Sequence, residues 1–128
     1  MNEQSNTKLD IVNHMRKAYS EKNWELLKSF FADDVFYRPG AVKEMIGKQA
    51  IVDTFQQLYS IYTVDNMLPH RTWELEDVVI MEYDMRVTRI SDNKSIKFPC
   101  VDIYQFKGDV ISDWRVYPMH AKFAVSED

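Results

Sequence analysis

One acidic residue lies among apolar residues in the most regular stretch of the sequence, Ile96–Lys107. If this stretch is a strand, its side chains alternate between two faces. Asp102 then shares a face with Cys100, Tyr104 and further apolar neighbours, and that is the face that an interior would take. A carboxylate in such surroundings must be hydrogen-bonded, paired with a charge, or kept neutral by a raised pKa.

Three roles for Asp102 follow from these surroundings, and the residues alone leave all three open. The carboxylate can be a buried group that is satisfied by a tyrosine or a backbone N–H. It can be a polar anchor for a ligand, or it can transfer protons during catalysis. Tyr19 lies on the buried side of an expected helix, and its hydroxyl can serve as the partner.

Two histidines are candidates for a second proton-transfer group. His70 stands at the start of an expected strand, and His120 follows the last one, where it can overhang the open end of the fold. Histidine suits this role because its pKa lies near neutral pH. These two and His14 show no metal-ligand spacing, so we expect no metal site. Cys100 has no adjacent base or cation and is expected to act as a small apolar residue.

The bulk properties are those of an ordinary globular chain. With 128 residues, 45% of them hydrophobic and 28% charged, we expect a single domain over residues 1–128 with flexible tails at 1–6 and 121–128. The net charge is -4 and no basic cluster occurs, which argues against nucleic-acid binding. The single cysteine excludes an internal disulfide, and neither a signal peptide nor a membrane-spanning run is visible. We therefore expect a cytoplasmic protein.

The first 60 residues favour three helices. The first is capped by Thr7 or Asp10 and runs to about Lys22. The second is Trp24–Phe31 and the third is Lys48–Tyr59, each supported by apolar residues at helical spacing. The positions expected to be buried are Ile11, Val12, Met15, Ala18 and Tyr19 in the first helix, Leu26, Leu27, Phe30 and Phe31 in the second, and Ile51, Val52, Phe55, Leu58 and Tyr59 in the third.

From Pro69 onward the apolar residues alternate instead, which predicts strands. Four strands are expected in this part of the chain, His70–Glu76, Val78–Arg89, Ile96–Lys107 and Val110–Pro118, and two short strands are expected before it, Val35–Arg38 and Val42–Ile46. Trp73 and Leu75 share one face of their strand, and the last strand places Val110, Trp114 and Val116 together. Helices followed by a meander of antiparallel strands predict an α+β fold, in which three helices pack on a strongly curved sheet and form a cone with an internal cavity.

Three sequence segments resemble segments of a known superfamily: Trp24–Asp34 (WELLKSFFADD), Gly47–Ile51 (GKQAI) and Val101–Tyr117 (VDIYQFKGDVISDWRVY). With the order of the elements, they make the chain resemble the nuclear transport factor 2-like superfamily, and within it the SnoaL-like group. The resemblance implies a cone of three helices and a curved sheet, and a homodimer, as in many members. The functions of the superfamily are scattered over ketosteroid isomerases, polyketide cyclases, epoxide hydrolases, dehydratases and non-catalytic domains, so the fold does not fix the function.

The resemblance to the ketosteroid isomerases carries over at one of three catalytic positions. Asp102 falls where those enzymes keep a protonated aspartate in the oxyanion hole. Their tyrosine on the first helix falls near Met15, and their general-base aspartate falls near Arg38 or Pro39. None of these three residues can take those parts, which argues against isomerase activity of that type.

Other enzymes of the superfamily match less well. The Asp-Arg-Asp arrangement of the epoxide hydrolases has only Asp84 and Arg86 as counterparts, and parity turns both outward. The last strand ends in Val116–Pro118 without a carboxylate. The paired inward histidines of the dehydratases would require His70 and His120. The alternation of the strand places His70 on the face opposite to Trp73 and Leu75, so it does not match this arrangement.

The leading interpretation is a small-molecule-binding cone whose cavity takes an apolar or aromatic ligand and needs no cofactor. The residues expected to line the cavity are Met15, Tyr19, Tyr83, Met85, Asp102, Tyr104 and Trp114. If the protein is an enzyme, we expect proton transfer next to a carbonyl, in an isomerisation or an aldol-type cyclisation. Asp102 would donate to the oxyanion when neutral or act as a base when ionised, with His70 or His120 as the second group.

The competing interpretation is a non-catalytic dimerising or partner-binding module whose interior is closed by Phe and Met side chains. Glu82, Asp84 and Arg86 form a charged row on the outer face of the sheet. This row is either a solvated face or part of a dimer surface, in which each ion pair contributes little alone.

Overall fold

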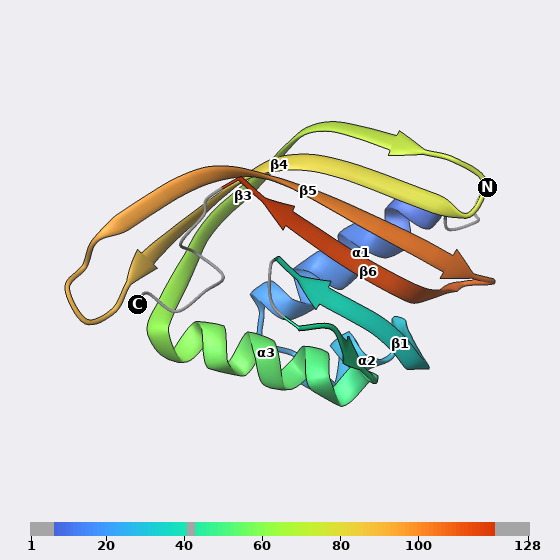
Figure 1. Cartoon of the computed structure of the whole chain (residues 1–128), viewed down its shortest axis with the longest axis horizontal. Helices are drawn as coiled ribbons and strands as arrows, with labels where there is room; N and C mark the ends of the chain where they lie inside the picture. Colours follow the sequence, from blue (N-terminus) through green and yellow to red (C-terminus); the bar gives the residue numbers. More distant parts are fainter. Residues whose placement is uncertain (1–6, 41–42, 120–128) are drawn as a thin grey trace.

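Three helices and one six-stranded sheet make up the chain, in a computed structural model that describes residues 7–40 and 43–119. The elements are α1 (Lys8–Ser20), α2 (Trp24–Lys28), β1 (Phe31–Pro39), β2 (Met45–Ile46), α3 (Lys48–Ile61), β3 (Tyr62–Glu74), β4 (Val78–Arg89), β5 (Ser95–Lys107) and β6 (Val110–Pro118). Figure 1 shows the long strands β3 to β6 arching over α1, with α3 below them. The predicted α+β class is confirmed.

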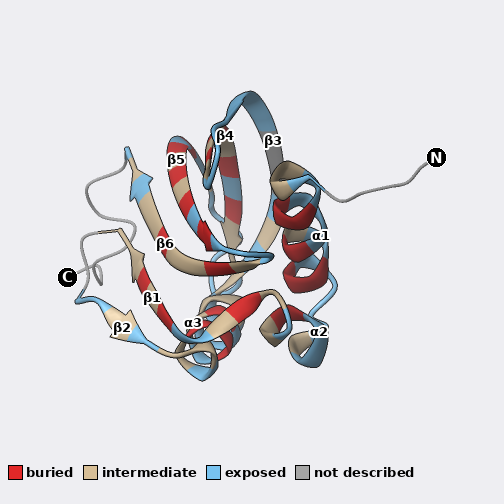
Figure 2. Ribbon diagram, turned by 90° about the vertical axis from the view of Figure 1, so that its right-hand side faces the viewer, coloured by how far each residue is buried: buried red, intermediate tan, exposed pale blue. Residues whose placement is uncertain are grey.

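The strand order is β2-β1-β6-β5-β4-β3, and every pair is antiparallel except β1 with β6. The sheet curls strongly into a half-barrel, and the helices lie at its concave side (Figure 2). Helix α1 packs on β3 and β4, while α3 packs on β1 and β3. Buried and less buried residues alternate along β4 and β5, so one face of the sheet forms the core.

Local signals at the element ends explain several boundaries. Thr7 caps α1 in a capping box with Asp10, so the first of the two predicted caps is the one used. Asn93 has a φ of 60° in the turn between β4 and β5, a conformation that asparagine adopts more readily than most residues. Gly47 precedes α3 with a φ of 105°, where a side chain would be strained.

The predicted second helix is too long, because its last residues belong to a strand. Helix α2 ends at Lys28, and the Ser29 hydroxyl donates to the carbonyl of Leu26 at 2.6 Å. Phe31 starts β1 and pairs with Ile111 of β6, so sheet pairing replaces the helical turn. Leu26 was predicted to be buried, but it is 45% exposed. In this short helix, Leu27 is the residue that is buried in the core.

The predicted strand His70–Glu76 is the end of a much longer one. Strand β3 begins at Tyr62 and stops at Glu74, so Leu75 lies in the turn and is exposed. Pro69 suggested a strand start, but β3 is an edge strand, where a proline costs no ladder hydrogen bond. Trp73 is also exposed, at 43%, because it lies on the outer face beside Ile80.

Two further strand predictions need correction. Strand β2 covers only Met45–Ile46, and Val42 lies outside the described residues. In β6, the register with β5 shifts between Gln105 and Phe106, so the buried residues are Ile111 and Trp114. Val110 was predicted to share the face of Trp114. The register shift is a β-bulge, and it breaks the alternation between these two residues, so this prediction is wrong. The predicted tails, 1–6 and 121–128, also lie outside the described residues.

Candidate functional site

Asp102 lies in the middle of β5, on the inner face of the sheet, and is 1% exposed. Its strand is paired on both sides, opposite Met81 of β4 and Val116 of β6. Among the described residues it is the one charged side chain that is fully buried. The alternation of β5 that predicted an interior carboxylate is therefore confirmed.

Three side chains from three strands donate hydrogen bonds to this carboxylate. The Tyr83 hydroxyl donates to Oδ1 at 3.0 Å. The Tyr104 hydroxyl and the Trp114 Nε1–H both donate to Oδ2, at 2.8 and 3.1 Å. An indole N–H can only donate, so this arrangement matches an ionised carboxylate better than a neutral acid.

Burial and hydrogen bonding act against each other on the proton affinity of Asp102. Burial raises the pKa of the carboxyl from an ordinary value of 3.8 to about 6, and the three donors and the charge of Arg16 limit the rise. The group is therefore mostly ionised at pH 7, with the neutral form close in free energy. Of the two roles predicted for Asp102, the base role fits this arrangement more directly than the role of a neutral donor.

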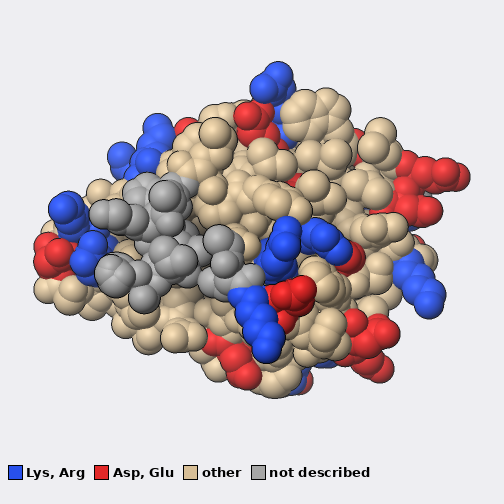
Figure 3. Space-filling view, viewed as in Figure 1, with Lys and Arg blue, Asp and Glu red and all other residues tan. Residues whose placement is uncertain are grey.

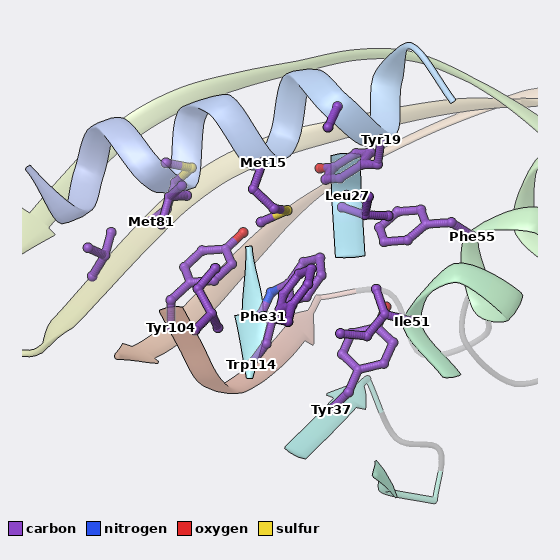
Figure 4. Close-up of a cluster of buried hydrophobic side chains, with 14 of the residues drawn as sticks. Met15, Tyr19, Leu27, Phe31, Tyr37, Ile51, Phe55, Met81, Tyr104 and Trp114 are labelled. Carbon is purple, nitrogen blue, oxygen red and sulfur yellow. The ribbon is translucent and has the colours of Figure 1, made fainter. Parts of the chain in front are cut away.

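Helix α1 closes the site from the other side with Met15, Arg16 and Tyr19. Met15 and Tyr19 are buried, and Figure 4 shows both pointing from α1 toward Tyr104 and Trp114. The Arg16 guanidinium lies 5.1 Å from the centre of the Tyr83 ring and its Nη1 lies 2.8 Å from the Met81 sulfur. It also hydrogen-bonds the Tyr19 side chain, whose pKa is raised by burial.

Trp114 is the centre of an aromatic cluster in the interior. Its ring centre lies 4.9 Å from that of Tyr37 and 5.2 Å from that of Tyr104. Phe31 and Phe55 lie slightly farther away, at 5.8 and 5.9 Å. Tyr19 stacks on Phe55 at 4.3 Å, so residues from α1, α3, β1, β5 and β6 meet around one indole.

The structure thus brings together most of the predicted ligand-binding residues. Tyr83, Tyr104 and Trp114 donate to Asp102. Met15 and Tyr19 point from α1 toward Tyr104 and Trp114. Met85 is also buried on the inner face, but it lies beside Phe98, farther along β4.

The predicted second proton-transfer groups do not join this site. His70 Nε2 lies 3.0 Å from Asp84 Oδ2, on the outer face of the sheet, and Lys97 approaches the same oxygen at 3.6 Å. Asp84 points outward, as parity predicted. His120 lies outside the described residues. The Cys100 thiol is buried, which raises its pKa to about 12 and keeps it protonated and unreactive, as expected of a small apolar residue.

Sequence reasoning missed three residues of this site: Arg16, Tyr37 and Phe31. Arg16 lies beside the apolar stripe of α1, and its long side chain reaches the interior from there. The spacing of Arg16 and Tyr19 could have indicated their contact, because side chains three residues apart on a helix are neighbours. Tyr37 and Phe31 reach Trp114 through the parallel pairing of β1 with β6, for which no local pattern exists.

Residues 7–40 and 43–119 contain no group of three acidic, histidine or cysteine side chains that could hold a metal ion. In the same part of the chain, every helix is too short or too polar to cross a membrane.

Comparison with known proteins adds a family and a fold. The sequence profile of the SnoaL-like domain family matches residues 12–114. A candidate polyketide cyclase from Xanthomonas campestris pv. campestris has a similar structure, with a TM-score of 0.75, 17% identity, and coverage of 88% of this chain and 92% of that one. A candidate isomerase from Rhodopseudomonas palustris gives a TM-score of 0.79, 15% identity, and coverage of 94% and 93%.

A third similar structure was solved with a ligand. It is a protein with a ketosteroid isomerase-like fold from Catenulispora acidiphila, in complex with trimethylamine, with a TM-score of 0.76, 18% identity and 84% of each chain covered. No curated protein sequence matches the chain. At these identities the structural likeness establishes the fold and leaves the activity open.

Proposed function

Because the chain belongs to the SnoaL-like domain family, we propose that it binds a small molecule and catalyses cofactor-free proton transfer next to a carbonyl, with Asp102 as the acid–base group. The observation that carries this proposal is a fully buried carboxylate that accepts three hydrogen bonds and has a pKa of about 6. A general base with a pKa near the working pH is ionised enough to take a proton and acidic enough to return it.

One oxygen of Asp102 has room for the proton. Oδ2 already accepts from Tyr104 and Trp114, whereas Oδ1 accepts only from Tyr83 among the described residues. A carboxylate offers about four acceptor positions, so one position on Oδ1 remains.

The proposed step is the removal of a proton from the carbon next to a ketone. Asp102 Oδ1 takes the proton, and the electron pair of the C–H bond moves to the carbonyl oxygen to form an enolate. In an isomerisation, Asp102 returns the proton to another carbon of the conjugated system. In a cyclisation, the enolate carbon attacks a second carbonyl, and Asp102 protonates the resulting alkoxide.

The surroundings of Asp102 suit such a reaction. Arg16 places a positive charge over the ring of Tyr83 and can stabilise the enolate charge. The aromatic cluster around Trp114 favours an apolar or aromatic ligand, because flat rings stack on these faces. The similar structures described as a cyclase and an isomerase support this choice of chemistry.

The test is proton exchange in D2O. The bicyclic ketone 2-tetralone has acidic protons beside its carbonyl, and NMR follows their replacement by deuterium. We expect wild-type protein to accelerate the exchange and Asp102→Asn to lower the protein-dependent rate about 100-fold or more. Asp84→Asn, which removes an outward-facing carboxylate, is the matched control and should keep the rate. If the wild type and Asp102→Asn exchange equally, Asp102 is not the base.

A second candidate function is a homodimerising or partner-binding module, favoured by one feature of the outer sheet face. Trp73 and Tyr117 are exposed there, at 43% and 41%, and cross-strand pairing places them around Ile80, Val101 and Ile103. Figure 3 shows a broad uncharged area between charged side chains of both signs. Such a patch is suited to a protein interface.

The dimer is tested by size-exclusion chromatography combined with light scattering. Glu82 pairs with Arg71 at 2.9 Å at the border of this patch. Glu82→Lys places a positive charge there and should shift a dimer toward monomer. An unchanged elution volume would mean that this face is not the interface.

A further inference from the structure

Three arginine side chains on the outer face of the sheet each lie over an aromatic ring. Measured from the guanidinium carbon to the ring centre, the pairs are Arg71 over Trp73 at 5.5 Å, Arg115 over Phe36 at 4.5 Å and Arg38 over Tyr117 at 5.7 Å. A guanidinium group that lies over a ring still carries N–H groups along its edges, and these need acceptors. The three pairs can therefore be compared by the acceptors that they have.

In two of the three pairs, a carboxylate completes the arrangement. Arg71 Nε donates to Glu82 Oε1 at 2.9 Å. Arg115 Nε and Nη2 donate to the two oxygens of Asp113, at 2.9 and 3.1 Å. The N–H groups of Nε and Nη2 point in the same direction, so they match the two oxygens of a carboxylate. A carboxylate on Nε is thus the common arrangement on this face.

Arg38 differs from the other two because it has a hydroxyl in place of a carboxylate. Its Nη2 donates to the Tyr117 hydroxyl at 3.3 Å. Its Nε is buried and has no hydrogen-bond partner within residues 7–40 and 43–119. A buried N–H of a charged group bears a high cost when it lacks an acceptor. The edge of Arg38 that corresponds to the carboxylate-binding edge of Arg115 therefore has one acceptor for two donors.

The charges around Arg38 also favour an anion. Arg38 and Arg115 are register partners on the neighbouring strands β1 and β6 (Figure 1), and both interact with the Tyr117 hydroxyl. Asp113 pairs with Arg115, whereas Arg38 forms no ion pair with the described part of the chain. Two positive charges on neighbouring residues repel each other, and a carboxylate beside Arg38 would relieve this repulsion. Tyr117 is 41% exposed, so its ring can turn aside to admit one.

We infer that Arg38 and Tyr117 form a binding site, on the outer face of the sheet, for a small carboxylic acid that carries an aromatic ring. The carboxylate accepts hydrogen bonds from Arg38 Nε and Nη2 and can also accept one from the Tyr117 hydroxyl. Val101 and Ile103 face outward on the adjacent strand β5 and offer an apolar surface to the ring. This site is separate from Asp102, which lies on the inner face of the same sheet.

The test is a titration with benzoate, followed by NMR of the backbone amides of β1 and β6. Benzoate should shift these signals and that of Arg38 Nε–H in a saturable way, and benzamide, which has the same ring without the charge, should not. Arg38→Gln should weaken benzoate binding about tenfold or more, because it removes the charge and both donors. Arg71→Gln is the matched control, since Arg71 also lies over a ring but has Glu82 on its Nε, and it should change the affinity less than twofold.

Two further variants separate this site from other ways of binding benzoate. Arg38→Lys keeps the positive charge but cannot present two parallel N–H groups, so it should weaken benzoate binding about fivefold. Asp102→Asn should leave the affinity within twofold of the wild type, because Asp102 faces the other side of the sheet. A tenfold change in Asp102→Asn would place benzoate in the interior and overturn the inference.

Other results would also overturn it. If the wild type does not bind benzoate in a saturable way, or binds benzamide equally well, the outer face has no carboxylate site. Equal losses in Arg38→Gln and Arg71→Gln, or an unchanged affinity in Arg38→Lys, would mean that benzoate is attracted by charge alone. If Arg38→Gln turned a dimer into a monomer in light scattering, the carboxylate at Arg38 would come from a second copy of the chain and not from a small acid.

Discussion

The Tyr104 hydroxyl donates to Asp102 Oδ2 at 2.8 Å, although the two residues are only two positions apart on one strand. Residues at i and i+2 share a face of a strand, and the strong curl of the sheet tips their side chains toward each other. Tyr83 and Trp114 complete the shell from the neighbouring strands. The charge of Asp102 is thus held by donors from β4, β5 and β6 together.

The stability of the protein should depend on pH through Asp102. The pKa of this carboxyl is about 6 in the folded protein and 3.8 as an ordinary value, so between these values the folded state binds more protons than the unfolded state. The stabilisation is fully present below pH 4 and is lost as the pH rises through 6. The loss is about 3 kcal/mol at pH 7, at about 1.36 kcal/mol per pKa unit.

This dependence is measured as a difference between two proteins. Urea unfolding at pH 4 to 7.5 gives the free energy of unfolding of the wild type and of Asp102→Asn. The wild type should lose about 3 kcal/mol relative to Asp102→Asn over this range. Taking the difference removes the titration of the other groups. A flat difference would mean that Asp102 is not a buried group with a raised pKa.

Removing the charge of Arg16 should raise the pKa of Asp102 above 6, because that charge favours the ionised carboxylate. Arg16→Met keeps a long side chain that can pack against Met81 and Tyr83. Carbon NMR of the aspartate carboxyl groups reads the titration directly, and the control is Arg86→Met on the exposed outer side of β4. An unchanged titration midpoint in Arg16→Met would exclude an electrostatic role for Arg16.

Replacing Trp114 should be the most damaging single change in the aromatic cluster. Trp114→Phe removes the N–H that donates to Asp102 Oδ2 and leaves a gap where the larger indole packed. We expect a loss of about 2–3 kcal/mol in the free energy of unfolding, measured with urea at pH 7. Trp73→Phe is the control, because Trp73 is 43% exposed, and it should cost less than about 1 kcal/mol. Equal losses would contradict the central position of Trp114.

Much of the site could be predicted because alternation is a local property of strands. The period of β5 placed Asp102 and Tyr104 on one face, and the period of β4 placed Tyr83 on the same side. The donors themselves could not be predicted, because they depend on register. The bulge between Gln105 and Phe106 sets which residues of β6 face inward, and no spacing rule locates it.

The missed residues share a physical cause, which is that tertiary contacts decided their places. The residues around Phe31 have the apolar spacing of a helix. Phe31 nevertheless belongs to β1, because it pairs with Ile111 of β6, which is far away in the sequence. The same pairing turned Tyr37 onto Trp114. The side chain of Arg16 reaches past the edge of the apolar stripe on α1 to contact Met81 and Tyr83. Such contacts exist only once the sheet has formed.

The last prediction separates the two faces of the sheet. His70 bonds to Asp84 on the outer face, so His70→Gln should leave the exchange of 2-tetralone protons within twofold of the wild type. The His70 side chain is 44% exposed and the pair is open to solvent, so its loss should cost less than about 1 kcal/mol of stability. Proton NMR in D2O measures the exchange, and urea unfolding at pH 7 measures the stability. Asp102→Asn is run beside it as the variant expected to lose activity. A drop of tenfold or more in His70→Gln would mean that the histidine reaches the ligand during turnover, and Asp102 would then share the proton transfer with a group that lies across the sheet in this structure.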